Sequence, residues 1–190
     1  MSELLVICGA QKDFFQEPFG NPKAVKILPK MIEYVNAWDG DIIAVKETRF
    51  TADQIEDLLP YGSASVPAWN NSREHLAFGY PEHCIKFSEG WDILPGLLKA
   101  LQSKNETRCK FRTVEAYGQT WHDWANNLDG YDSITVIGAK LEDQVISTVF
   151  AIMAVKPEAM IIVPSLMCCS EFTSDYEKTL SVLREKVIVY

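Results

Sequence analysis

The sequence has no clustered run of basic residues, and acidic side chains outnumber basic ones. Its 26 Asp and Glu against 18 Lys and Arg give a formal net charge of −8. Nucleic acids and anionic membranes attract basic surfaces, so we expect neither as a partner. The sequence also has no stretch of about 18 uninterrupted apolar residues, the length that a transmembrane helix needs. We therefore expect no membrane span.

Cysteine spacings typical of metal sites are absent, and the cysteines do not suggest a disulfide framework. Their number is odd, and most of them lie in apolar segments: Cys8, Cys84, Cys109, Cys168 and Cys169. This pattern is typical of reduced, buried thiols. The opening MSELLVICG has no basic region, and its apolar run is too short for a signal peptide. We expect a soluble cytoplasmic protein that needs no cofactor.

The composition is that of a globular chain, with 190 residues and 47% hydrophobic content. This length favours one domain over residues 1–190 with one sizeable core. Short apolar runs alternate with segments of helical period. The expected strands are Leu4–Cys8, Asp41–Val45, His83–Phe87, Arg108–Arg112, Ile134–Ile137, Ala159–Val163 and Val187–Tyr190. The expected helices are Pro22–Asn36, Thr51–Leu59, Leu94–Gln102, Gly118–Leu128, a helix from Val145 and Ser174–Arg184. This order predicts an α/β fold, a three-layer α/β/α sandwich around a mostly parallel, doubly wound sheet.

A long segment from residue 60 to 81 interrupts the alternation and has no clean period. Loops of this length in compact domains are often functional lids, although a surface insertion is an equal alternative. Its aromatic residues, Trp69 among them, suit either the lining of a ligand pocket or an oligomer interface.

The segment SITVIGAKLEDQVISTV, residues 133–149, organises the chain. It predicts a buried strand, a turn and then a helix. Ligands of open α/β sheets bind at the carboxyl ends of strands, so the turn from Gly138 to Gln144 is the expected binding site. The turn holds Ala139 and Lys140 but no nucleophilic side chain.

Several motifs in order resemble the isochorismatase-like cysteine hydrolases, the superfamily of nicotinamidases, N-carbamoylsarcosine amidases and isochorismatases. LLVICGAQKDFF resembles the family's opening strand, AVKETRF its second strand, and CKFRTVEAYG the segment with the family lysine. VIGAKLEDQVISTVFAI resembles the strand, turn and helix of the nucleophilic cysteine. YPEHCIKFSEGWDILPGL resembles a further family segment through Pro81, His83, Cys84, Ser88, Gly90, Pro95 and Leu97.

The resemblance implies a catalytic triad that this chain only partly keeps. The lysine position falls on Lys110, the nucleophile position on Gln144, and the aspartate position on Cys8 or Gly9. Many nicotinamidases hold a divalent metal just after the second strand, but ETRFTADQ has Phe50 in place of the aspartate and no histidine. We therefore expect no metal site. The family is commonly dimeric or tetrameric, which implies a homo-oligomer.

Three functional hypotheses follow. In the first, the chain has lost cysteine-hydrolase activity and keeps a small-molecule or protein-binding role. In the second, it hydrolyses small amides with Cys8 as a transposed nucleophile that faces Lys110, which we expect on a buried strand. In the third, it is a regulatory or structural subunit. The expected pocket residues are Gln11, Asp13, Phe14, Trp69, Gly138, Ala139 and Lys140.

Overall fold

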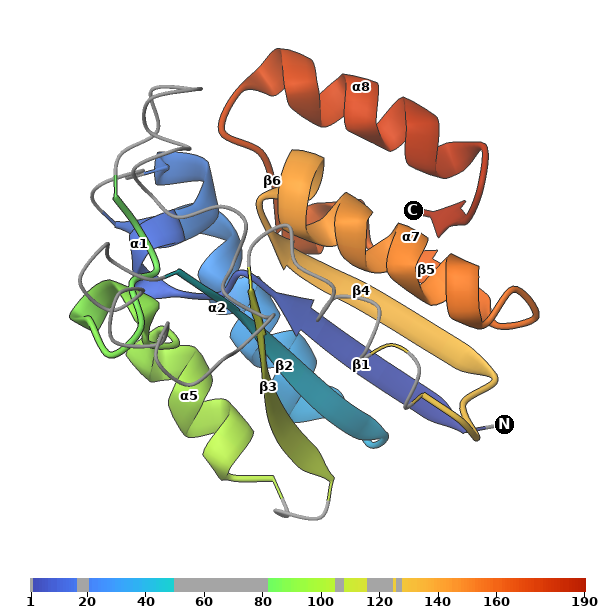
Figure 1. Cartoon of the computed structure of the whole chain (residues 1–190), viewed down its shortest axis with the longest axis horizontal. Helices are drawn as coiled ribbons and strands as arrows, with labels where there is room; N and C mark the ends of the chain where they lie inside the picture. The colour runs from blue at the N-terminus through green and yellow to red at the C-terminus, as the bar shows by residue number, and fades with distance from the viewer. Residues whose placement is uncertain (1, 17–20, 50–81, 105–107, 116–124, 126–127) are drawn as a thin grey trace, which may run out of the picture.

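The computed structural model describes residues 2–16, 21–49, 82–104, 108–115, 125 and 128–190 (Figure 1). Within these residues a sheet of seven strands forms the centre of the molecule, and every strand pair in it is parallel. Its order is β3 (Cys109–Glu115), β2 (Asp41–Thr48), β1 (Glu3–Cys8), β4 (Ser133–Ala139), β5 (Met160–Val163) and β7 (Ile188–Val189), with β6 (Cys168–Cys169) on β4. This arrangement confirms the predicted α/β fold.

Two helical layers cover the sheet, one on each face (Figure 1). On one face α2 (Pro22–Ala37) and α5 (Pro95–Gln102) pack on Leu5 and Ile7. On the other, α7 (Ile146–Val155) and α8 (Thr173–Arg184) share a core with Leu4 and Val6. Alternate residues of β1 thus enter opposite cores, because successive side chains of a strand point to opposite faces. Burial on both faces explains why this strand is apolar throughout.

The strand order changes direction between β1 and β4, where the site is expected. From β1 the chain continues to β2 and β3 on one side, and it returns through β4 to β5 on the other. Such a reversal leaves a crevice at the carboxyl ends of the two central strands. The segments that follow them are α1 (Lys12–Phe15) after β1 and the π-helical turn η3 (Leu141–Val145) after β4.

Most predicted elements are confirmed. α2 begins at Pro22, and the side chain of Asn21 caps it by accepting a hydrogen bond from the Lys23 amide. β2 runs three residues beyond its predicted end at Val45 and so includes Glu47. The strand predicted at His83–Phe87 is wrong: these residues form turns, with positive φ at Cys84 and Phe87, followed by η2 (Glu89–Trp91). The loop at 60–81, the helix at 51–59 and most of the helix at 118–128 lie outside the described residues.

Among the described residues no helix is long and apolar enough to cross a bilayer.

Candidate functional site

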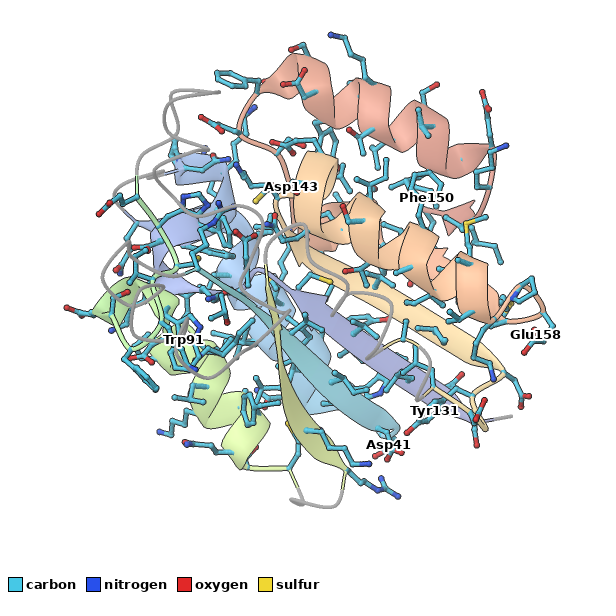
Figure 2. All side chains as sticks on the ribbon, in the orientation of Figure 1. Asp41, Trp91, Tyr131, Asp143, Phe150 and Glu158 are labelled. Atoms are coloured by element: carbon cyan, nitrogen blue, oxygen red, sulfur yellow. The ribbon has the colours of Figure 1, made fainter. Side chains whose placement is uncertain are left out.

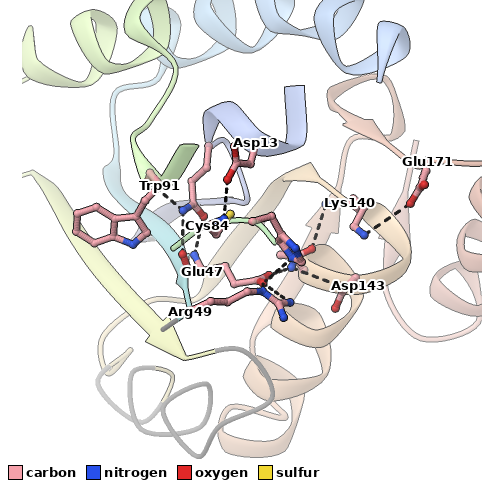
Figure 3. A network of polar contacts seen from close by, with 11 residues as sticks. Asp13, Glu47, Arg49, Cys84, Trp91, Lys140, Asp143 and Glu171 are labelled. Atoms are coloured by element: carbon pink, nitrogen blue, oxygen red, sulfur yellow. Dashed lines mark hydrogen bonds and ion pairs between the residues drawn. The ribbon is translucent and has the colours of Figure 1, made fainter. Parts of the chain in front are cut away.

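A buried carboxylate at the end of β2 is the centre of a polar network (Figure 3). Glu47 and Arg49 are both 2% exposed, and the Arg49 guanidinium contacts Glu47 Oε1 through Nε at 2.6 Å and Nη2 at 2.5 Å. His83 is equally buried, and its Nε2 lies 3.4 Å from the same oxygen. Residues two apart on a strand share a face, which is why Glu47 and Arg49 meet.

Gln144 completes the network from the opposite side of the crevice. Its Nε2 donates a hydrogen bond to Glu47 Oε2, and its Oε1 accepts one from the Lys140 amide at 3.2 Å. The side chain is buried, and one end of its amide joins η3 to β2 while the other bonds within the turn itself. The predicted nucleophile position carries a structural amide.

Gln11 holds the other flank of the network. Its Nε2 donates to the backbone carbonyls of Glu47 at 2.8 Å and Trp91 at 3.0 Å, and its Oε1 accepts from the Glu47 amide at 2.7 Å. Gln11 is fully buried. A carboxamide has two N–H donors, and both are used here, so Gln11 fixes the backbone around Glu47.

The surroundings of Glu47 keep it ionised. Burial by itself would raise the pKa of this carboxyl, but the charge of Arg49 and the hydrogen bond from His83 outweigh it and lower the pKa to about 2. A buried carboxylate with a matched cation and several donors is stable in its charged form. Glu47 is thus an anion at neutral pH.

Asp143 and Lys140 bring further charge to the same turn. Burial and the neighbouring charge of Glu47 raise the pKa of the Asp143 carboxyl, whose Oδ2 lies 3.4 Å from Gln144 Nε2. The Lys140 ammonium lies 3.7 Å from Glu171 Oε2, beside β6. Two carboxyls whose pKa values move in opposite directions suit a site that handles protons or polar ligands.

The remaining described pocket residues support the turns around the network. Asp13 Oδ2 accepts a hydrogen bond from the Cys84 amide at 2.6 Å, and so helps to hold the turn in which Cys84 has φ 50°. The ring of Phe14 packs edge-on against that of His83, with centroids 5.8 Å apart. Gly138 and Ala139 are buried at the end of β4, and Trp69 lies outside the described residues.

Cys8 and Lys110 do not face each other. Cys8 is buried at the end of β1, and its thiol lies 3.2 Å from Thr148 Oγ1. Burial raises the pKa of Cys8 to about 12. Lys110 lies on β3 as predicted, but it is exposed, which corrects the expectation of a buried strand position. Lys110 is paired with Ile43 of β2, and Ile43 is paired with Val6 of β1. Lys110 therefore lies two strands away from β1, in register with the residue two positions before Cys8.

The predicted acid position has no room for an acid. Gly9 has φ +55°, and a Cβ built there would overlap the backbone carbonyl of Ala139. Gly138 at the end of β4 has φ +141°, and its Cβ would overlap the Cys8 carbonyl in the same way. Such close approach of two backbones requires glycine. The ends of β1 and β4 therefore pack too closely for a carboxylate at residue 9.

The residues at the end of β2 do not fit a divalent metal ion. Among the described residues no group of three His, Cys, Asp or Glu side chains could hold one. The carboxylate and the imidazole suited to such an ion are Glu47 and His83, and the guanidinium of Arg49 occupies the same carboxylate oxygen. A resident cation repels another, so no catalytic step is assigned to a metal here.

Sequence reasoning missed Glu47, Arg49 and the position of His83 within the network. The signal was present in AVKETRF, where an acid and a base two residues apart end a buried strand. A charged pair at that spacing, on a strand covered on both faces, predicts an internal ion pair. Phe50, the residue first placed at the metal position, lies outside the described residues.

Comparison with known proteins identifies the fold. Neither a protein-family model nor a curated protein sequence matches the chain. Solved structures do match over its whole length. A pyrazinamidase/nicotinamidase from Streptococcus mutans has a TM-score of 0.77 at 16% identity, covering 100% of both chains.

Two further solved structures also match the whole chain at low sequence identity. A pyrazinamidase of Pyrococcus horikoshii in complex with zinc has a TM-score of 0.71 at 16% identity, covering 100% of this chain and 99% of that one. An N-carbamoylsarcosine amidase from Thermoplasma acidophilum has a TM-score of 0.68 at 15% identity, covering 100% of this chain and 95% of that one. The chain has the fold of the isochorismatase-like hydrolases.

Proposed function

We propose that this chain is an isochorismatase-like protein that has lost cysteine-dependent hydrolysis and binds a small molecule at the carboxyl ends of β1, β2 and β4. The observation that carries the proposal is the state of Gln144. Its amide is buried and bonded at both ends, to Glu47 and to the Lys140 amide. A carboxamide is not a nucleophile, and this one is also committed to holding the turn.

The position of Cys8 supports the loss of thiol chemistry. Thiolates are the reactive form of cysteine, and burial raises the pKa of Cys8 to about 12. A neighbouring cation is one of the features that lower the pKa of a thiol, and Lys110 lies two strands away on an exposed position. This separation favours the loss of activity over the alternative in which Cys8 and Lys110 hydrolyse amides.

The chemistry of the turn favours a polar ligand. Asp143 is partly exposed, and it lies beside the cation of Lys140 and the amide of Gln144. The enzymes with similar structures take their names from nicotinamide, pyrazinamide and N-carbamoylsarcosine, all of them small amides. An amide offers both a donor and an acceptor, which a protonated or ionised Asp143 can match. As part of the same proposal, the chain forms a single domain, is cytoplasmic and assembles into a homo-oligomer.

Thermal unfolding with these three compounds tests binding, and release of ammonia tests turnover. A ligand that binds only the folded chain raises its Tm. We expect at least one amide to raise Tm without ammonia release, and Asp143→Asn to reduce that rise. Asp132→Asn is the matched control. Asp132 lies just before the amino end of β4, away from the carboxyl ends of the strands, and accepts a hydrogen bond from the Ser2 amide.

Two results would contradict the proposal. Ammonia release that disappears in Cys8→Ala would establish the active cysteine hydrolase. Unchanged Tm with every compound, together with a partner protein that co-purifies from the native cell, would favour the regulatory subunit.

A further inference from the structure

The cluster of Glu47, Arg49 and His83 has the composition of a metal site with one ligand replaced by a cation. All three side chains are 2% exposed. A carboxylate and an imidazole are ligands that zinc and other transition metals accept in proteins. The third member is a guanidinium, which brings its own positive charge to the carboxylate.

The spacing of the two ligand atoms matches a shared metal ion. Glu47 Oε1 and His83 Nε2 are 3.4 Å apart. Two ligands of a tetrahedral zinc ion at bond lengths of about 2.0–2.1 Å lie about 3.3 Å from each other. His83 also gives this oxygen a long hydrogen bond, since such bonds most often measure about 2.9–3.0 Å. The separation is therefore also compatible with a pair of ligands around a common centre.

Arg49 supplies the charge that such an ion would supply. Its Nε and Nη2 lie within 2.6 Å of Glu47 Oε1, the same oxygen that faces His83. The backbone of Arg49 is fixed, because its amide donates to the Cys84 carbonyl and its own carbonyl accepts from Lys86. The side chain at position 49 therefore starts from a fixed backbone beside the cluster.

We infer that the Arg49 guanidinium is a built-in cation that replaces a divalent metal ion between Glu47 and His83, and that the substitution Arg49→His converts the cluster into a zinc site. The inference is independent of the proposed ligand-binding function, since it concerns metal affinity alone. In the native chain Glu47 needs no metal for charge balance. In the Arg49→His variant the carboxylate and two imidazoles make a three-ligand set.

Calorimetric titration with Zn²⁺ tests the inference on the full chain. We expect no saturable binding at this cluster in the native protein, and one Zn²⁺ per chain in Arg49→His with a Tm that rises by several degrees. The bound state of Co²⁺ gives an independent optical signal. Arg49→His combined with His83→Ala, or with Glu47→Gln, should lose at least tenfold in affinity. Arg49→Leu is the matched control, because its apolar side chain carries no metal ligand.

Zn²⁺ binding by the native chain that Glu47→Gln abolishes would overturn the inference, because Arg49 would then not replace the ion. A folded Arg49→His chain that binds no Zn²⁺, or binds it equally well without His83, would also overturn it. If Arg49→His is unfolded without metal, recovery of the folded state with Zn²⁺ supports the inference, and failure to recover counts against it.

Discussion

Glu47 and Gln144, which are 97 residues apart in the chain, form a direct buried hydrogen bond between the end of β2 and the turn after β4 (Figure 3). The bond joins a carboxylate that must stay charged to an amide at the position where the resemblance implies a nucleophile. The candidate site is therefore organised around an anion.

Removal of the Gln144 amide should destabilise the fold. Gln144→Ala leaves Glu47 Oε2 and the Lys140 amide without this partner, which costs about 1–3 kcal/mol in the free energy of unfolding. Urea denaturation measures the change. Gln102→Ala is the control, because Gln102 is exposed near the end of α5 and should change stability by less than about 0.5 kcal/mol. Equal stability of the two variants would contradict a structural role.

Removing one partner of the Glu47–Arg49 ion pair should lower the free energy of unfolding strongly. Arg49→Met leaves a buried carboxylate without its main cation, and we expect a loss of about 3–5 kcal/mol. The double variant Glu47→Gln with Arg49→Met should recover part of that loss. Glu89→Gln, which removes the exposed pair with Lys12, should have no measurable effect. A double variant no more stable than Arg49→Met would contradict this interpretation of the pair.

Glu47 should also make the fold sensitive to acid. The pKa of its carboxyl is about 2 in the folded chain against an ordinary 4.5. Because the folded value is the lower one, this stabilisation is fully present above the unfolded pKa and is lost as pH falls from about 5 to about 2. The lost part corresponds to about 3 kcal/mol. In Glu47→Gln the free energy of unfolding should depend less steeply on pH across this range. An unchanged pH dependence would contradict the assignment.

Cys8 should be inert in the folded chain. With its pKa near 12 and its thiol packed on Thr148, iodoacetamide at neutral pH should leave Cys8 unmodified, whereas the unfolded chain in urea should react. Mass spectrometry of digested protein reports the adduct. Lys110→Ala should change nothing, because that side chain lies on an exposed strand position. A rapid adduct that Lys110→Ala abolishes would support the transposed nucleophile instead.

The contact between the ends of β1 and β4 should tolerate no side chain at residue 9. Gly9→Ala places a Cβ on the Ala139 carbonyl and forces a positive φ on alanine, so we expect poor folding or a large loss in Tm. Gly130→Ala also has positive φ, but nothing lies within 4 Å of its Cβ. It should cost only about 1–2 kcal/mol. Similar losses in both variants would show that the backbone conformation alone matters.

The side chains of the two cores explain why the fold could be predicted (Figure 2). Apolar runs such as Leu4–Cys8 predict buried strands because every residue of the run is covered, whichever face it points to. Asn21 and Pro22 mark the start of α2 through local chemistry, without long-range information. The turns at 83–87 escape such a prediction because Asp13, far away in sequence, accepts the Cys84 amide and helps to hold a positive φ there.

The sequence alone determined the layered α/β architecture, because periodicity is a local property, and it predicted a candidate site at the carboxyl ends of the strands. Only the tertiary structure decided what occupies the site. It placed Arg49, His83 and Gln144 around Glu47 and separated Cys8 from Lys110 by two strands. Those outcomes depend on strand order and register between distant segments, which set the distances that decide whether two charged groups interact.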